Sequence, residues 1–187
     1  REAAHSRKII YGRARIGGNV VYLESTGDDN KYLWLVTAIA GHEIDGYEEV
    51  WFNDEKIWDG GNFTSAWATT GNSSTSPYVD LSFHLGNQTT VDSGLDNAST
   101  KWTSNHILLD TAYMVVKLTY DQEQFAQGLP NISTVVRGKK VWHPNHSSPV
   151  WSQNPALCIR DYLTDTKYGL GESSANIASI NTAFGVC

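Results

Sequence analysis

Cysteine and methionine are nearly absent from the chain. Only two cysteines, Cys158 and Cys187, occur among 187 residues, too few to hold a domain of this size together by disulfide bonds. We expect both to be buried free thiols. Met114 is the only methionine, and the sequence begins with Arg1. We therefore expect residues 1–187 to be a fragment of a longer product.

Long apolar runs and clusters of basic residues are also missing. No segment is apolar over the roughly 20 residues that a membrane-spanning helix needs, and no signal peptide is recognisable. The formal net charge is −6, from 14 Lys and Arg against 20 Asp and Glu. The basic residues are scattered, whereas a surface that neutralises phosphates needs them clustered. We predict no membrane span and no stable nucleic-acid binding.

Motifs that carry chemistry are missing as well. The sequence contains no nucleophile elbow, no phosphate-binding glycine loop and no zinc-protease helix. Glu48 and Glu49 are adjacent in a predicted strand, so we expect them on opposite faces, and we expect Asp161 on the solvent side of a helix. His143 and His146 lack a third ligand at a typical spacing. We therefore predict no metal site, no cofactor and no enzymatic activity.

Short segments rich in β-branched and aromatic residues favour strands. Residues 8–16 and 19–24 are predicted to form a hairpin around Gly17-Gly18. Residues 32–40 are apolar at nearly every position, which is typical of a strand buried on both faces. Further strands are predicted at residues 44–52, 55–58, 78–85 and 113–120.

Residues 59–77 consist mainly of Gly, Ser, Thr and Asn, with Phe63 and Trp67 as isolated apolar residues. This composition is typical of an exposed excursion, and we predict an inserted subdomain over approximately residues 59–112. Trp67, Trp102 and Trp151 lie in predicted loops. If they form one exposed patch, they would favour a receptor- or glycan-binding module.

Residues 129–171 hold the clearest local signals. A strand is predicted at residues 132–136, followed by a tight turn at Arg137-Gly138, with positive φ at Gly138, and a returning strand at residues 139–142. Asn154 is a favourable N-cap and Pro155 suits the first helical position. The apolar side of this helix is predicted to consist of Ala156, Cys158, Ile159, Tyr162 and Leu163.

A final short helix is predicted after Ser174, because Ile177, Ile180, Phe184 and Cys187 recur at helical spacing. We expect the two helices to pack on the β domain through Ile159, Leu163, Ile180 and Phe184. The predicted fold is therefore mainly β (α+β), a barrel- or sandwich-like domain with two short C-terminal helices.

Four stretches in order resemble the tail-tip protein J family of long-tailed bacteriophages, the central hub or host-specificity proteins of the tail tip. They are IIYGRARIGGNVVYLE, LVTAIAGHEIDGYEEVWFNDE, WTSNHILLDTAYMVVKLTYDQEQFAQGLPNI, and RGKKVWHP followed by WSQNPALCIRDYLTDTKYGLG. The resemblance covers most of the chain and is weak only over residues 59–78.

This resemblance implies a structural part of the hub that closes the tail tube and links it to receptor-binding parts. It also implies a virion protein, made in the bacterial cytoplasm, that assembles as a threefold ring with itself and contacts other tail-tip and tail-tube proteins. Two alternatives remain. A cell-wall hydrolase of the injection apparatus would show two facing carboxylates in a cleft, and a receptor-binding module would show exposed loop tryptophans.

Overall fold

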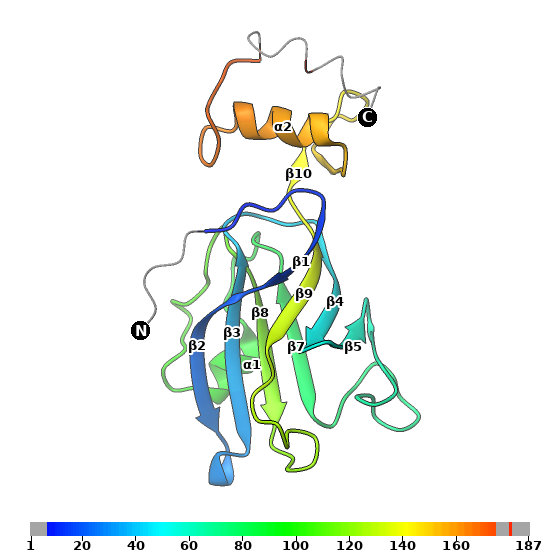
Figure 1. The fold of residues 1–187 in the computed structure, drawn as a ribbon. Helices are drawn as coiled ribbons and strands as arrows, with labels where there is room; N and C mark the ends of the chain where they lie inside the picture. The colour runs from blue at the N-terminus through cyan, green and yellow to red at the C-terminus, as the bar shows by residue number, and fades with distance from the viewer. Residues whose placement is uncertain (1–6, 175–179, 181–187) are drawn as a thin grey trace.

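A computed structural model of the chain describes residues 7–174 and residue 180. Two antiparallel sheets form a sandwich-like, mainly β domain, as predicted (Figure 1). The five-stranded sheet has the order β1 (Arg13–Gly17), β9 (Ile132–Arg137), β4 (Gly46–Phe52), β5 (Glu55–Asp59), β6 (Asn62–Phe63). The four-stranded sheet has the order β2 (Asn19–Thr26), β3 (Tyr32–Ala40), β8 (Ala112–Thr119), β7 (Val79–His84).

The smaller elements lie at the ends and on the outside of the sandwich. A 3-10 turn, η1 (Asp28–Asn30), follows β2, and α1 (Ser93–Ala98) lies in the connection from β7 to β8. The pair β10 (Lys140–Val141) and β11 (Val150–Trp151) leads to α2 (Pro155–Thr164). Figure 1 shows α2 beyond one end of the sheets, joined to β9 through β10.

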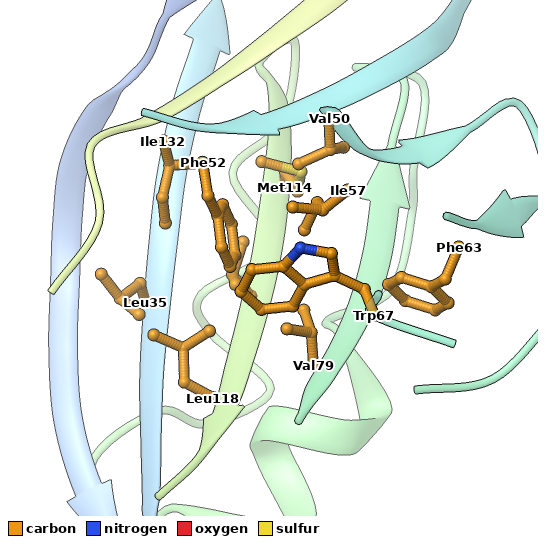
Figure 2. Packing of buried hydrophobic residues seen from close by; sticks show 11 residues of the cluster. Leu35, Val50, Phe52, Ile57, Phe63, Trp67, Val79, Met114, Leu118 and Ile132 are labelled. Atoms are coloured by element: carbon orange, nitrogen blue, oxygen red, sulfur yellow. The ribbon is translucent and has the colours of Figure 1, made fainter. Parts of the chain in front are cut away.

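The main core lies between the two sheets and is completed by a loop residue. Trp67 is only 4% exposed, and its ring lies among side chains from both sheets (Figure 2). Its indole Nε1 donates to Glu55 Oε1 at 2.8 Å, so the one polar atom of the ring is satisfied. The other buried members are Leu35, Val50, Phe52, Ile57, Phe63, Val79, Met114, Val116, Leu118 and Ile132.

Strands β3 and β8 are buried on both faces, which explains their nearly continuous apolar sequences. Leu35 and Val116 face the five-stranded sheet, whereas Trp34, Tyr113 and Val115 belong to a second cluster on the outside. Residues 85–111, including α1, contribute Leu95 and Trp102 to that cluster. The prediction of a doubly buried strand at residues 32–40 is confirmed.

The predicted hairpin at Gly17-Gly18 is wrong. β1 pairs with β9 and β2 pairs with β3, so the chain turns a corner between the sheets. A Cβ atom on Gly18 would lie 2.1 Å from Thr37 Cγ2 and 2.9 Å from Ala38 O. Glycine is needed here because one backbone passes close to another. In the sequence, a glycine required for close approach looks the same as a glycine required for a turn.

The predicted turn at Gly138 is also wrong, because β10 pairs with β11 and does not return along β9. The φ angle of Gly138 is not in the left-handed region. Gly138 N donates to Gly12 O at 2.7 Å, and Lys139 N donates to Ile10 O at 2.8 Å. A Cβ atom on Gly138 would lie 2.2 Å from Ile10 O, so close backbone approach requires this glycine.

Residues 59–112 share the core of the domain. β7 pairs with β8 in the four-stranded sheet, while Phe63 and Trp67 enter the core between the sheets. Helix α1 lies in this segment, and Asp92 caps it by accepting from Leu95 N. That this segment is an insertion stays a prediction.

Replacing Gly138 by alanine tests the close approach. We expect Gly138→Ala to lower the free energy of unfolding by about 1–3 kcal/mol, because the added methyl group forces two backbones apart. Gly17→Ala is the matched control, since its Cβ atom would lie 3.9 Å from Ile132 O. Urea unfolding measures both variants, and equal midpoints would contradict the assignment.

Candidate functional site

Residues 8–12 connect the sandwich to the C-terminal elements, and we call them the N-terminal strap. On the sandwich side, Gly41 N donates to Lys8 O at 3.0 Å. Ile10 N donates to His42 Nε2 at 2.9 Å, while His42 Nδ1 lies 2.7 Å from Glu43 O. Burial lowers the pKa of His42, so the neutral ring accepts through Nε2 and donates through Nδ1.

The same strap holds the C-terminal elements. Gly12 O accepts from Trp151 Nε1 at 3.1 Å, and Tyr11 Oη donates to Asp161 Oδ2 at 2.6 Å. Burial, together with the Asp161 carboxylate, raises the pKa of Tyr11. The hydroxyl therefore stays protonated and remains a donor to α2.

An ion network completes this junction. Lys139 Nζ donates to Asp161 Oδ2 at 2.5 Å and to Asp165 Oδ2. The three side chains are 15–17% exposed. Asp165 Oδ1 also accepts from Lys167 N and Tyr168 N, both at 2.7 Å. Burial alone would raise the pKa of Asp165, but the hydrogen bonds from Lys139 and these amides lower it to about 2.

The prediction that Asp161 faces solvent is wrong. Asp161 lies in α2, and Asp165 is the C-cap residue at its end. Because they are four residues apart, both lie on the same side of the helix and both reach Lys139. That spacing was a usable sequence signal for a shared cation. The identity of the cation and the contact with Tyr11 required the tertiary structure.

The apolar side predicted for α2 is only partly buried. Ile159 is 53% exposed and Tyr162 is 43% exposed, whereas Ala156 and Leu157 are buried. Leu163 is half-buried. The ion network turns the side of α2 that carries Asp161 towards Lys139. Phe184, predicted to pack with them, lies outside the described residues, as does Ile177 of the predicted final helix, and Ile180 is half-buried.

The start of α2 agrees with the sequence. Asn154 is the N-cap and its Oδ1 accepts from Ala156 N at 2.9 Å, with Pro155 at the beginning of the helix. These residues satisfy or remove the amide donors that the first turn leaves open.

A second polar cluster fastens residues 85–111 to the four-stranded sheet. Asp92 is 4% exposed and accepts from Ser82 Oγ at 2.6 Å, His84 Nε2 at 2.9 Å and Leu95 N at 2.8 Å. The His84 ring stacks on Tyr113 with centroids 4.1 Å apart. Burial alone would raise the pKa of Asp92, but these three hydrogen bonds lower it to about 2.

This cluster does not have the geometry of a nucleophilic triad. His84 approaches both Ser82 Oγ, at 3.4 Å, and Asp92 through the same Nε2 atom. A catalytic histidine uses opposite ring nitrogens for the nucleophile and the acid. Ser82 instead donates directly to Asp92, so the arrangement is a structural clamp.

Glu48 and Glu49 do not lie on opposite faces. Arg13 Nε lies 2.5 Å from Glu48 Oε2 and Arg13 Nη2 lies 3.3 Å from Glu49 Oε1. The pairing of β4 with β9 skips Glu48, and a bulge of this kind breaks the alternation of side chains. Arg137 Nη1 also reaches Glu48, at 3.7 Å, so the pair is neutralised by arginines.

The remaining candidate residues have structural surroundings. Trp67 and Trp102 are each 4% exposed, so the exposed patch of Trp67, Trp102 and Trp151 that would favour a receptor- or glycan-binding module does not form. The His143 and His146 rings meet edge to face, 4.7 Å apart. Cys158 is a free thiol whose pKa is raised by burial, and Cys187 lies outside the described residues.

Two further features are absent from residues 7–174 and 180. Within that part of the chain, no three His, Cys, Asp or Glu side chains are grouped so that they could hold a metal ion. In the same residues, no helix is both long and apolar enough to cross a membrane.

Removing the ammonium group of Lys139 tests the junction. We expect Lys139→Met to lower the free energy of unfolding by about 1–3 kcal/mol, because two partly buried carboxylates lose their cation. Lys167→Met is the control, since its ion pair with Asp110 is largely exposed and should contribute little. If thermal unfolding shows equal losses for both variants, the junction does not depend on this ion network.

The lowered pKa of Asp92 predicts a specific acid sensitivity. A folded-state pKa of about 2, against an ordinary 3.8, contributes stability above pH 4 that is lost as the pH falls towards 2. This contribution is on the order of 2 kcal/mol. Asp92→Asn should therefore be less stable than the wild type at pH 7, and the difference should shrink between pH 4 and pH 2.

Urea unfolding at each pH measures this difference, with Asp80→Asn as the control because Asp80 is exposed beside Lys117. A difference between wild type and Asp92→Asn that stays constant down to pH 2 would contradict the proposed clamp.

The chain is similar to known proteins in sequence and in fold. No protein-family model matches the chain. In sequence the chain is similar to baseplate hub protein pb3 of Escherichia phage T5, with 24% identity. That alignment covers 89% of this chain but 23% of the hub protein.

In fold, the chain is similar to a chain in the virion of a native gene transfer agent particle. The TM-score is 0.51 at 15% sequence identity, covering 95% of this chain and 36% of that chain. One relative is a baseplate hub protein and the other belongs to a virion. The sequence likeness supports a structural role in a phage tail or baseplate, and the second likeness shows a similar fold.

Proposed function

We propose that the chain is part of the central hub of a phage tail tip, which closes the tail tube and links it to receptor-binding parts. The observation that carries this proposal is the sequence likeness to a baseplate hub protein over 89% of the chain. The four ordered stretches that resemble the protein J family support the same assignment. The hub protein would be made in the host cytoplasm and would function in the virion.

In this proposal the partners are two further copies in a threefold ring, together with other tail-tip and tail-tube proteins. A cyclic trimer is built from heterologous contacts, so each copy needs two different and complementary surfaces. The domain's rigid sandwich and its separate α2 end offer distinct surfaces for such contacts. Residues 59–112 would be an insertion that adapts the domain to its neighbours.

The charge of the chain suits passage of a genome through such a ring. Its net charge is −6, and Arg13, Arg137 and Lys139 are paired with carboxylates. Few cations are therefore available to hold phosphates. Loops such as residues 25–31 and 59–77 would line the channel with acidic or neutral side chains, and the protein would not bind DNA stably.

Asp80 and Asp92 line one hollow of about 430 Å³, but Asp80 pairs with Lys117, and Asp92 accepts from Ser82, His84 and Leu95. The carboxylates of Glu48 and Glu49 are both held by Arg13, and those of Asp161 and Asp165 are both held by Lys139. The loop residues Trp67 and Trp102 are core residues. The proposed role is therefore structural and not enzymatic.

The proposal predicts the position and copy number of the full-length protein. Gold-labelled antibodies against this domain should bind intact particles at the distal end of the tail, and native mass spectrometry of the purified full-length protein should show trimers. Antibodies against the tail-tube protein provide the positional control. Labelling along the tail shaft or on the head, or a protein that remains monomeric at all concentrations, would contradict the proposal.

A further inference from the structure

His42 fastens the N-terminal strap to the sandwich through a buried ring. The residue lies shortly after β3 and is 4% exposed. Its Nε2 atom accepts from Ile10 N at 2.9 Å, and its Nδ1 atom lies 2.7 Å from Glu43 O. A backbone amide only donates and a carbonyl oxygen only accepts. The contacts themselves therefore require a neutral ring with its proton on Nδ1.

A second proton on this ring is incompatible with the bound strap. It would sit on Nε2 and face the Ile10 N–H group, so that two buried donors would point at each other. Such a pair costs free energy until one of the groups moves away. The strap is the part that can move, because residues 8–12 form neither helix nor strand. The loop that carries His42 is anchored where Ile44 N donates to Leu85 O at 2.8 Å.

The charged groups near His42 leave burial as the dominant influence on its protonation. Lys139 disfavours a second positive charge, whereas Asp161 and Asp165 favour one, but burial is the largest effect and lowers the pKa of His42. The two carboxylates are already bound to Lys139. Arg7, which lies beside the residue that precedes His42, is a further cation on the strap side. The buried ring is therefore neutral at pH 7.

Other ionisable groups on neighbouring residues are engaged elsewhere. In the loop, Glu43 Oε1 lies 3.1 Å from Lys140 Nζ. On the strap, Lys8 Nζ donates to a backbone carbonyl and the Tyr11 hydroxyl donates to α2. These contacts do not involve the His42 ring, so its own proton is the one that opposes the Ile10 amide.

His84, which lies two residues before a glycine that packs on the His42 backbone, responds to acid in the opposite direction. His84 Nε2 lies 2.9 Å from Asp92 Oδ2, so a proton on that ring adds an ion pair. Acid therefore strengthens the contact of His84 with Asp92 and weakens the contact of His42 with Ile10.

We propose that His42 is an acid-sensitive latch for the N-terminal strap. In mildly acidic solution the ring takes up a proton, and residues 8–12 leave the end of the sandwich that faces α2, where Figure 1 shows them in blue. β11 then loses its contact with Gly12, and α2 loses its contact with Tyr11. The ion network with Lys139 remains and keeps α2 attached. The latch belongs to this domain and does not depend on the hub assignment.

Proton linkage sets the size and the pH range of the effect. With the strap open, His42 takes up its proton near its ordinary pKa of 6.5, whereas with the strap closed its pKa is lower. The closed state is therefore fully favoured above pH 6.5. As the pH falls below that value, the open fraction rises by up to about tenfold for each pH unit, until the pKa of the closed state is reached.

Amide hydrogen exchange of the purified full-length protein at pH 7.5 and pH 5.5 tests the latch, with each rate divided by the intrinsic rate at that pH. The reporter amides are those hydrogen-bonded at the strap, on Ile10, Gly41, Gly138 and Lys139. We expect their protection to fall by about three- to tenfold at pH 5.5. Peptides from the middle of β3 are the internal control, because this strand is paired on both sides. Equal protection of the reporter amides at the two pH values overturns the inference.

His42→Gln separates the ring from other effects of acid. A glutamine side chain offers an amide oxygen as the acceptor for Ile10 N and gains no proton in this pH range. The variant should therefore protect the reporter amides equally at pH 7.5 and pH 5.5. His106→Gln is the matched control, since His106 is exposed in the connection from β7 to β8, and it should retain the wild-type loss. A His42→Gln protein that loses protection as the wild type does overturns the inference.

The wild-type pH profile decides the outcome if His42→Gln does not fold. A loss of protection that begins below pH 6.5 and follows the uptake of one proton supports the latch. A loss that begins only below about pH 4.5, where carboxylates take up protons, assigns the release to Asp161 and Asp165 and overturns the inference. Absence of the protein from phage particles would contradict the hub assignment and leave this result unchanged.

Discussion

The close passage of the N-terminal strap beside Gly138 is the contact on which the arrangement of the two ends depends. Gly138 and Lys139 donate to the backbone of the strap. These hydrogen bonds extend the backbone pairing of β1 with β9 past the end of β9. The same five residues bind His42 in the sandwich and Trp151 and Asp161 in the C-terminal elements. Any side chain at Gly138 would separate these backbones and so loosen all three attachments.

Polar and ionic contacts hold the acidic side of α2, whose Ala156 and Leu157 are also buried. Lys139 is drawn to Asp161 and Asp165, and the Tyr11 hydroxyl completes the coordination of Asp161. The helix therefore turns its acidic side to the sandwich and leaves Ile159 and Tyr162 exposed. Directional contacts of this kind fix an orientation that a purely apolar interface would leave less defined.

The sandwich is filled on the inside and covered on one outer face. Trp67 fills the space between the sheets (Figure 2), and the connection with α1 covers the outside of β3 and β8. β2 is the outer strand of the four-stranded sheet.

Local sequence determined much of the fold of this protein. The apolar run at residues 32–40 and the Asn154-Pro155 start of α2 depend on neighbours along the chain, and both were predictable. Gly17-Gly18 and Gly138 were recognisable as special positions, but the same signal fits a turn or a close approach. Only the tertiary structure decided between the two, because the obstructing atoms belong to Thr37 and Ile10.

The candidate site was decided almost wholly by tertiary structure. Tyr11 and Asp161, which meet at the junction, are 150 positions apart, and no local periodicity links them. The bulge that places Glu48 beside Glu49 arises from pairing with β9. Sequence alone determined which segments form strands and where a helix begins, because those preferences act between adjacent residues. Which face each element buries was decided by charged and backbone partners that only folding brings into contact.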